Sequence, residues 1–221
     1  NITLLKQLNS KLLINHLLHG SGLNPNKPVT VEETDETYPI KPEAWDNWLP
    51  FAYLAFNRLA GLGVPIKSFA TLGTGQGADA IGALFAFKDL EMIVLTDLDS
   101  KFLEIAKQNF ERYSCSKPVL ALVGYFCEPL IRIGARLDLV YENLPNIPDS
   151  SDIGEGYRRA SRFDPESIGS LAEDNEAKVY LLESHNAVLA QAKKGLNKNG
   201  SVICSIGGRM PYYLLKRLVE K

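Results

Sequence analysis

The chain has 221 residues, of which 45% are hydrophobic and 23% charged, so it can bury a core and is not a disordered segment. Its 24 Lys and Arg residues against 26 Asp and Glu residues leave no broad cationic field, so a nucleic-acid partner is not expected. The cysteines, Cys115, Cys127 and Cys204, form no CxxC pair, which predicts neither a disulfide framework nor a metal site. The apolar start at 2–18 is interrupted by polar residues, so we expect this segment to form neither a continuous membrane span nor the apolar core of a signal peptide. We therefore expect a cytoplasmic protein.

An N-terminal extension precedes the rest of the domain. It has three segments: a helix at 2–19, extended chain rich in proline and acidic residues at 24–42, and a second helix at 43–62. Pro50 predicts a kink or break in the second helix. We expect residues 1–62 to form a helical and extended cap over a pocket. Aromatic residues in this cap fit a roof over a ligand, but their helical spacing is more typical of a core: Trp45, Trp48 and Tyr53.

From residue 63 onward, short apolar strands alternate with amphipathic helices, which predicts a doubly wound, mostly parallel α/β sheet over 63–221. The strands are expected at 68–72, 92–97, 119–124, 137–142 and 201–206. The helices are expected at 78–87, 100–113, 177–196 and 212–219. The segment 149–175 is too long for an ordinary connection and is the candidate for substrate selection.

A glycine-rich turn follows the first strand and opens a helix. It contains Gly73, Thr74, Gly75, Gln76 and Gly77, and its glycines let the backbone approach a ligand. Twenty residues later, Asp97 ends the next strand, where a carboxylate can accept hydrogen bonds from both ribose hydroxyls. An adenosine-type ligand suits this pattern. The alternative is a tight structural turn in which Asp97 only caps the helix at Ser100.

The glycine spacing alone does not choose between two cofactor classes. The turn can be written G-x-G-x-x-A, as in dinucleotide-binding proteins, or G-x-G-x-G, as in proteins that bind S-adenosylmethionine. A dinucleotide would place its pyrophosphate against the helix N-terminus, whereas S-adenosylmethionine would place its methionine moiety there. Later motifs must decide.

Two later stretches carry a family resemblance. The fourth strand runs directly into Asn143-Leu144-Pro145-Asn146-Ile147-Pro148, and Gly124-Tyr125-Phe126-Cys127-Glu128-Pro129-Leu130 lies upstream. Together with the glycine turn they resemble the class I S-adenosylmethionine-dependent methyltransferases, above all the branch of release-factor glutamine methyltransferases with its N-P-P-Y motif. The likeness covers about 68–209. It implies a Rossmann-like fold, S-adenosylmethionine as cofactor, and a nitrogen acceptor.

The resemblance also implies roles for residues. Those matching the cofactor site are Gly73, Thr74, Gly75, Gln76, Gly77, Asp97, Leu98, Tyr125, Phe126 and Asn143. Asn143 and Pro145 match the residues that aim the acceptor. The chain departs from the family at four positions: Thr71 and Tyr125 stand where acidic residues are usual, Leu144 replaces the first proline of the motif and Asn146 its aromatic residue. These changes leave methyl transfer better supported than a planar amide or nucleobase substrate.

Several further features of the sequence have simple interpretations. Ser205–Arg209 resembles the G-G-R segment of plant methionine S-methyltransferases, which supports a small-molecule acceptor. His16 and His19 are expected on the surface, and His185 is read as an ordinary exposed residue. The arginines of the long insertion are more typical of a solvated loop than of an anion site: Arg158, Arg159 and Arg162. Glu142 or Tyr141 could assist proton removal, and strand alternation places them on opposite faces.

Three functions stay open at this point. The first is methyl transfer from S-adenosylmethionine to a nitrogen or sulfur of a small molecule or protein side chain. The second is a nicotinamide-dependent oxidoreductase that uses the same glycine turn. The third is a non-catalytic binding protein with a cofactor fold, which the altered N-P-P-Y motif favours. The sequence names neither the acceptor nor the oligomeric state.

The end of the chain raises a question about the sheet edge. The family normally adds an antiparallel strand pair after the fifth strand, yet this sequence stops at Lys221 and begins at Asn1 rather than Met, so we expect a fragment. Without those strands, 201–206 would expose an unpaired edge. We expect this edge to be covered by another chain, for example in a homodimer, by the segment around Val29–Val31, or by a missing continuation.

Overall fold

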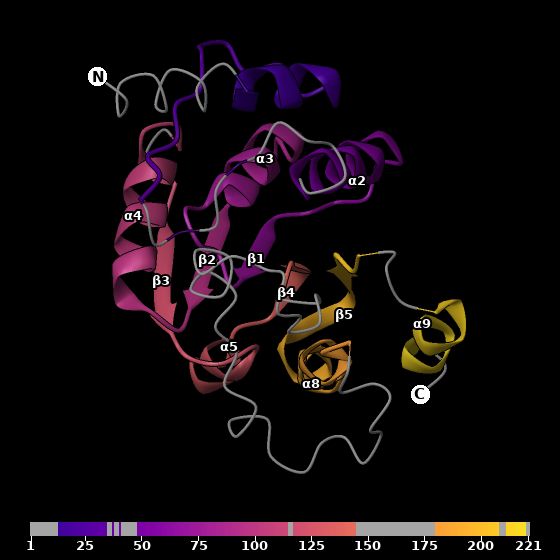
Figure 1. The fold of residues 1–221 in the computed structure, drawn as a ribbon. Coiled ribbons are helices and arrows are strands. Elements are labelled where there is room, and N and C mark those ends of the chain that lie inside the picture. Colours follow the sequence, from indigo (N-terminus) through magenta and orange to yellow (C-terminus); the bar gives the residue numbers. More distant parts are fainter. Residues whose placement is uncertain are drawn as a thin grey trace.

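The computed structural model describes residues 13–34, 37, 40, 48–114, 117–144, 180–207 and 211–219 (Figure 1). Residues 13–20 are helical. The other helices are α2 (Leu49–Gly61), α3 (Ala78–Ala86), α4 (Ser100–Glu111), α5 (Glu128–Arg132), α8 (Leu182–Gly195) and α9 (Tyr212–Val219). The strands are β1 (Ser68–Leu72), β2 (Met92–Asp97), β3 (Val119–Val123), β4 (Leu137–Glu142) and β5 (Leu196–Cys204). The short helix α5 was not predicted from the sequence.

The five strands form one sheet in the order β3-β2-β1-β4-β5, and every neighbouring pair is parallel. The order reverses at β1, because the chain first moves outward through β2 and β3 and then returns to β4 on the other side. This is the doubly wound arrangement that the sequence predicts, and it is confirmed. In such sheets ligands bind at the carboxyl ends of the strands, beside the point where the order reverses.

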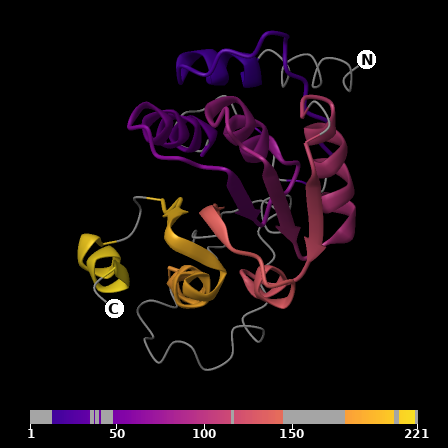
Figure 2. The same ribbon diagram turned by 180° about the vertical axis from the view of Figure 1, so that it is seen from behind.

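Helices cover both faces of the sheet (Figures 1 and 2). On one face, α2, α3 and α4 share a hydrophobic cluster with β1 and β4 residues such as Phe69 and Tyr141. On the other face, α5 and α8 pack on Ala70, Leu72 and Val140. Consecutive residues of β1 thus alternate between two buried layers. This explains why strands of this kind read as continuous apolar runs rather than as alternating ones.

The N-terminal extension packs on the α2/α3/α4 face. Ile14 and Leu18 of the first helix join the same hydrophobic cluster as α2, so the extension and the sheet share one core. Pro50 stands in the first turn of α2, where its missing N–H is not needed, and so it begins the helix instead of kinking it. Tyr53 is buried and donates a hydrogen bond to the Ala78 carbonyl, which places it in the core rather than over a ligand. Trp45 and the insertion 149–175 lie outside the described residues. The division at residue 62 stays a prediction.

The last strand differs from the prediction at its start. β5 already begins at Leu196, because the polar run 197–200 forms part of the strand although it reads as a loop. Among the described residues β5 pairs with β4 alone, so one of its edges carries no strand partner there. The suggestion that the segment around Val29–Val31 covers this edge is wrong. Thr30 is hydrogen-bonded to Tyr113 beside α4, on the β2–β3 side of the sheet.

Two kinds of feature are absent from the part of the chain that the structure describes. None of the described helices has the length and apolar character needed to cross a membrane. Within the same residues there is no group of three or more His, Cys, Asp or Glu side chains placed to hold a metal ion.

Candidate functional site at the carboxyl edge of the sheet

The parallel sheet brings most of the predicted site residues to one edge. The glycine turn follows β1, Asp97 and Leu98 end β2, Tyr125 and Phe126 follow β3, and Asn143 follows β4. Because the strands are parallel, these four strand ends lie side by side. Pro145 lies outside the described residues.

The glycine turn is held by backbone hydrogen bonds and uses left-handed conformations. Gly73, Gly75 and Gly77 have φ values of +65°, +51° and +79°. The Thr74 N–H donates to the Thr96 carbonyl on β2, and the Gly77 N–H donates back to the Thr74 carbonyl. A Cβ on Gly77 would lie 3.1 Å from the Ala106 carbonyl oxygen, whereas no described atom lies within 4 Å of a Cβ built on Gly75. The turn therefore rests on α4 at Gly77 and is open at Gly75.

Asp97 connects this turn to the end of β2. Its Oδ2 accepts from the Gly75 N–H at 2.9 Å, and its Oδ1 accepts from the N–H groups of Leu98 at 2.7 Å and Asp99 at 3.3 Å. Burial raises the pKa of the Asp97 carboxyl, and these N–H donors oppose the shift. The cap of α4 is Asp99, whose side chain accepts from the Lys101 N–H. The alternative in which Asp97 caps that helix is therefore wrong.

The chain after β3 lies beside Asp97, because the Gly124 N–H donates to the Asp97 carbonyl oxygen. Phe126 adopts a φ of +47°, a conformation that non-glycine residues rarely take, and its ring is 6.3 Å from that of Tyr125. Phe126 is nearly buried, while Leu98 is 43% exposed. The segment that carries these two aromatic rings thus begins beside the backbone of Asp97, which is followed by an exposed leucine. Strained residues of this kind are frequent at ligand sites.

A buried carboxylate beneath the turn was missed in the sequence. Asp79 in the first turn of α3 accepts a 2.5 Å hydrogen bond from the Thr71 hydroxyl. Burial raises the pKa of Asp79 from 3.8 to about 6. Thr71 is the position at which the related family has an acidic residue, so the structure places a carboxylate next to it from the helix. No local motif marks this pair, because the two residues belong to different elements.

The end of β4 reaches the glycine turn directly. A Cβ on Gly73 would lie only 3.1 Å from Cδ2 of Leu144, so the strand end that carries Asn143 lies against the turn. The Leu144 N–H donates to Oε2 of Glu142 at 2.9 Å, which fixes the backbone just after Asn143. Asn143 itself is partly buried.

Glu142 also forms a buried pair with a histidine. Its Oε1 is 2.5 Å from Nδ1 of His185 on α8, and both side chains are fully buried. The interpretation of His185 as an exposed residue is therefore wrong. His185 Nε2 has no hydrogen-bond partner among the described residues. Tyr141 lies on the opposite face, where its ring packs edge-on against Phe56.

Two thiols lie near this pair. Burial and the neighbouring Glu142 carboxylate raise the pKa of Cys127 to about 12 and raise that of Cys204 as well. Thiols held in the protonated form are weak nucleophiles. Cys127 and Cys204 are therefore held as protonated thiols beside this pair.

The residues present fit an adenosine cofactor with a positively charged tail. Gly75 leaves open space where the backbone meets a ligand, and the Thr74 Oγ1 atom is buried without a partner among the described residues. Asp97 Oδ2 accepts one hydrogen bond and keeps a second acceptor position. A ribose hydroxyl can use that position, and the carboxylates of the site favour a cationic ligand over a pyrophosphate.

Comparisons with known proteins agree with this geometry. The chain is 34% identical over 79 residues to the release factor glutamine methyltransferase of Thermosynechococcus vestitus, covering 36% of this chain and 27% of that protein. It is 26% identical over 136 residues to a bifunctional methyltransferase of Rickettsia prowazekii, covering 62% of this chain and 24% of that protein. The chain thus spans about a quarter of the length of these curated relatives. No family model matches it.

Solved structures show the same fold. SMU.776, assigned as a methyltransferase and solved with S-adenosylhomocysteine (SAH), aligns with a TM-score of 0.51 and 13% identity over 77% of this chain and 39% of that one. The resemblance to methyltransferases predicted from the sequence is therefore confirmed. The chain has the Rossmann-like fold of the class I S-adenosylmethionine-dependent methyltransferases.

Proposed function

We propose that this protein is an S-adenosylmethionine-dependent methyltransferase that acts on a nitrogen or sulfur of a small molecule or a protein side chain. The observation that carries the proposal is the hydrogen bond between Gly75 and Asp97. The open glycine donates its N–H to a carboxylate at the end of the next strand, 2.9 Å away. The methyltransferase names of the curated relatives support the same reading.

The proposed cofactor site uses the turn for the methionine moiety and Asp97 for the ribose. One ribose hydroxyl would use the acceptor position that Oδ2 keeps. The second would replace the 3.3 Å contact from the Asp99 N–H, which is the longest of the three bonds to this carboxylate. Leu98, Tyr125 and Phe126 would contact the adenine. When bound, S-adenosylmethionine supplies a methyl group on a sulfonium leaving group.

Asn143 is proposed to aim the acceptor. Its side-chain oxygen can accept a hydrogen bond from an acceptor N–H and so direct the nitrogen lone pair. Glu142 is bound to the Leu144 N–H and to His185, so it holds the backbone around Asn143. Catalysis of this kind rests on positioning of the reactants. Pro145 is proposed to complete the acceptor site.

Binding and turnover together test the proposal. Calorimetric titration should detect binding of SAH and no binding of NAD; the reverse would indicate a nicotinamide-dependent oxidoreductase. Transfer of a labelled methyl group is then measured with glutamine-containing peptides, small amines and thioethers. Binding of SAH without transfer to any acceptor class would instead support the non-catalytic alternative.

A further inference from the structure

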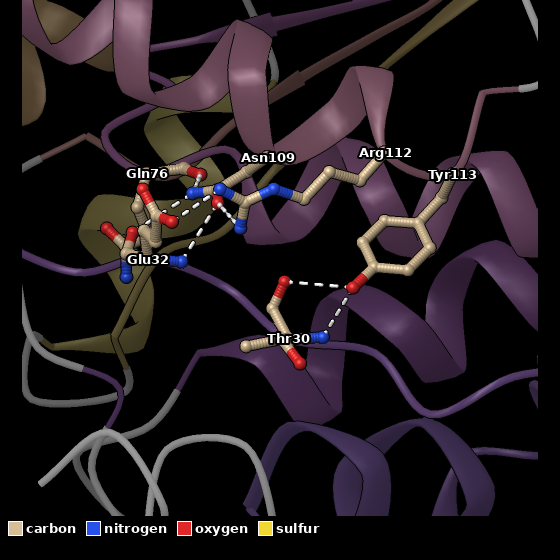
Figure 3. A network of polar contacts seen from close by, with 6 residues as sticks. All are labelled: Thr30, Glu32, Gln76, Asn109, Arg112 and Tyr113. Carbon is tan, nitrogen blue, oxygen red and sulfur yellow. Dashed lines mark hydrogen bonds and ion pairs between the residues drawn. The ribbon is translucent and has the colours of Figure 1, made fainter. Parts of the chain in front are cut away.

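An extended segment of the N-terminal extension is held by side chains instead of by a neighbouring strand. We call residues 29–32 the strap. Asn15 donates to the Val29 carbonyl at 2.7 Å and accepts from the Val29 N–H at 2.8 Å. The Tyr113 hydroxyl accepts from the Thr30 N–H at 2.6 Å and donates to the Thr30 backbone carbonyl at 3.1 Å (Figure 3). These paired bonds imitate a β-ladder and fix the strap between the helix at 13–20 and the end of α4.

Asn109 on α4 provides the third pair and also reaches the glycine turn. It accepts from the Glu32 N–H at 2.8 Å and donates to the Glu32 carbonyl at 3.0 Å. Its Nδ2 also donates to the Gln76 carbonyl at 3.0 Å (Figure 3). Arg112 donates to Asn109 Oδ1 and pairs with the Glu32 carboxylate. Asn109 is fully buried, and these bonds use its full hydrogen-bonding capacity.

The same face of α4 supports the turn at a second point. Ala106 lies one helical turn before Asn109, so both residues face the same side. A Cβ on Gly77 would lie 3.0 Å from the Ala106 Cβ. The back of the turn is therefore fixed by packing on Ala106 and by the bond from Asn109 to Gln76, while its front is open at Gly75.

We propose that Asn109 is a positioning residue that couples the strap to the cofactor turn. One amide group is shared between the Glu32 peptide and the Gln76 carbonyl, so loss of either partner leaves the amide free to move away from the other. Binding of a ligand at the turn then stabilises the strap by the same factor by which the strap raises the affinity of the turn. The identity of the ligand rests on the proposed function; the coupling between strap and turn does not.

Two substitutions test the coupling from its two ends. Asn109→Ala removes both sets of bonds, and Glu32→Pro removes the strap N–H that Asn109 accepts together with the carboxylate that pairs with Arg112. Each should weaken SAH binding about tenfold in calorimetry, within the usual range of coupling between sites. Glu32→Gln keeps the backbone N–H and changes only the exposed charge pair with Arg112, so it should bind as the wild type does. Lys107→Ala, on the exposed side of α4, is the second control.

Amide hydrogen exchange gives a readout that does not need methyl transfer. In the wild type, SAH should slow exchange at Thr30 and Glu32 as well as at Gly75, and Asn109→Ala should abolish the effect on Thr30. In the double variant, Glu32→Pro should add nothing to Asn109→Ala. Unchanged SAH affinity in both single variants, or an exchange rate at Thr30 that SAH does not change, would overturn the coupling.

A wrong cofactor and an absent coupling give different experimental results. If the wild type does not bind SAH, the proposed cofactor is wrong, and exchange of the Gly75 and Gly77 amides in the ligand-free protein still decides the coupling. Faster exchange at these amides in Glu32→Pro than in Glu32→Gln supports it, and equal exchange overturns it. This comparison also holds if Asn109→Ala fails to fold.

Discussion

The two halves of the carboxyl edge of the sheet are built from different groups. At the ends of β1 and β2, backbone amides of a glycine turn meet one carboxylate, and residues 22 positions apart make the contact. At the end of β4, a buried pair of ionisable side chains 43 positions apart holds the chain beside Asn143. The first half is suited to recognise a fixed cofactor, because backbone groups allow little variation. The second depends on side chains, in keeping with the acceptor role proposed for Asn143.

Breaking the buried pair should give the largest effect. His185→Ala removes the hydrogen bond to the buried Glu142 and leaves a cavity, which together should cost about 3–5 kcal/mol of stability. Urea unfolding measures this loss. Replacing both residues together, as Glu142→Gln with His185→Gln, keeps a polar side chain at each position and should cost much less. A single-variant loss under about 1 kcal/mol would mean that the pair does not stabilise this edge.

Asp79 predicts a pH dependence beneath the other half of the edge. Its pKa is raised from 3.8 to about 6, so between these values the folded protein holds a proton that the unfolded chain releases. The resulting stability is complete below the lower value and is lost as the pH rises through the higher one, a change of about 3 kcal/mol. The free energy of unfolding of Asp79→Asn, measured in urea and compared with that of the wild type, should therefore rise by about this much between pH 4 and pH 8. A difference that stays constant with pH would contradict the prediction.

Asn143→Ala should affect turnover without affecting cofactor binding. A group that aims the acceptor acts mainly in the transition state, so turnover should fall on the order of 100-fold. The dissociation constant of SAH should change little. Calorimetry and turnover are measured on the same preparation. An equal fall in cofactor affinity would assign Asn143 to the cofactor site instead.

The two glycines of the turn predict contrasting results. Gly75→Val places its branches in open space and adds only the roughly 1–2 kcal/mol of a left-handed residue, so the variant should stay folded and lose SAH binding. Gly77→Val has the same cost of a left-handed φ and also meets the backbone of Ala106, so it should lose more stability than Gly75→Val. Circular dichroism and thermal melting distinguish the two. Unfolding of Gly75→Val would mean that this glycine is structural.

The same contrast explains what could be predicted from the sequence. The glycine turn and Asp97 are visible because a strand, a turn and a second strand follow one another within a short stretch. Asp79 and His185 are not visible, because each becomes significant only when packing brings it to Thr71 or Glu142. The start of β5 was missed because a polar edge strand reads as a loop, and α5 because five residues carry no helical period.

The central claim, that the turn and Asp97 form one cofactor site, is tested most directly by calorimetry with SAH on two neighbouring aspartates. Asp97→Ala should weaken binding by about 2–4 kcal/mol, because charge-assisted hydrogen bonds to the ribose are lost. Asp99→Ala removes only the cap of α4, costs about 1 kcal/mol of stability and should leave the affinity unchanged. Equal SAH affinity in the wild type and Asp97→Ala would contradict the account.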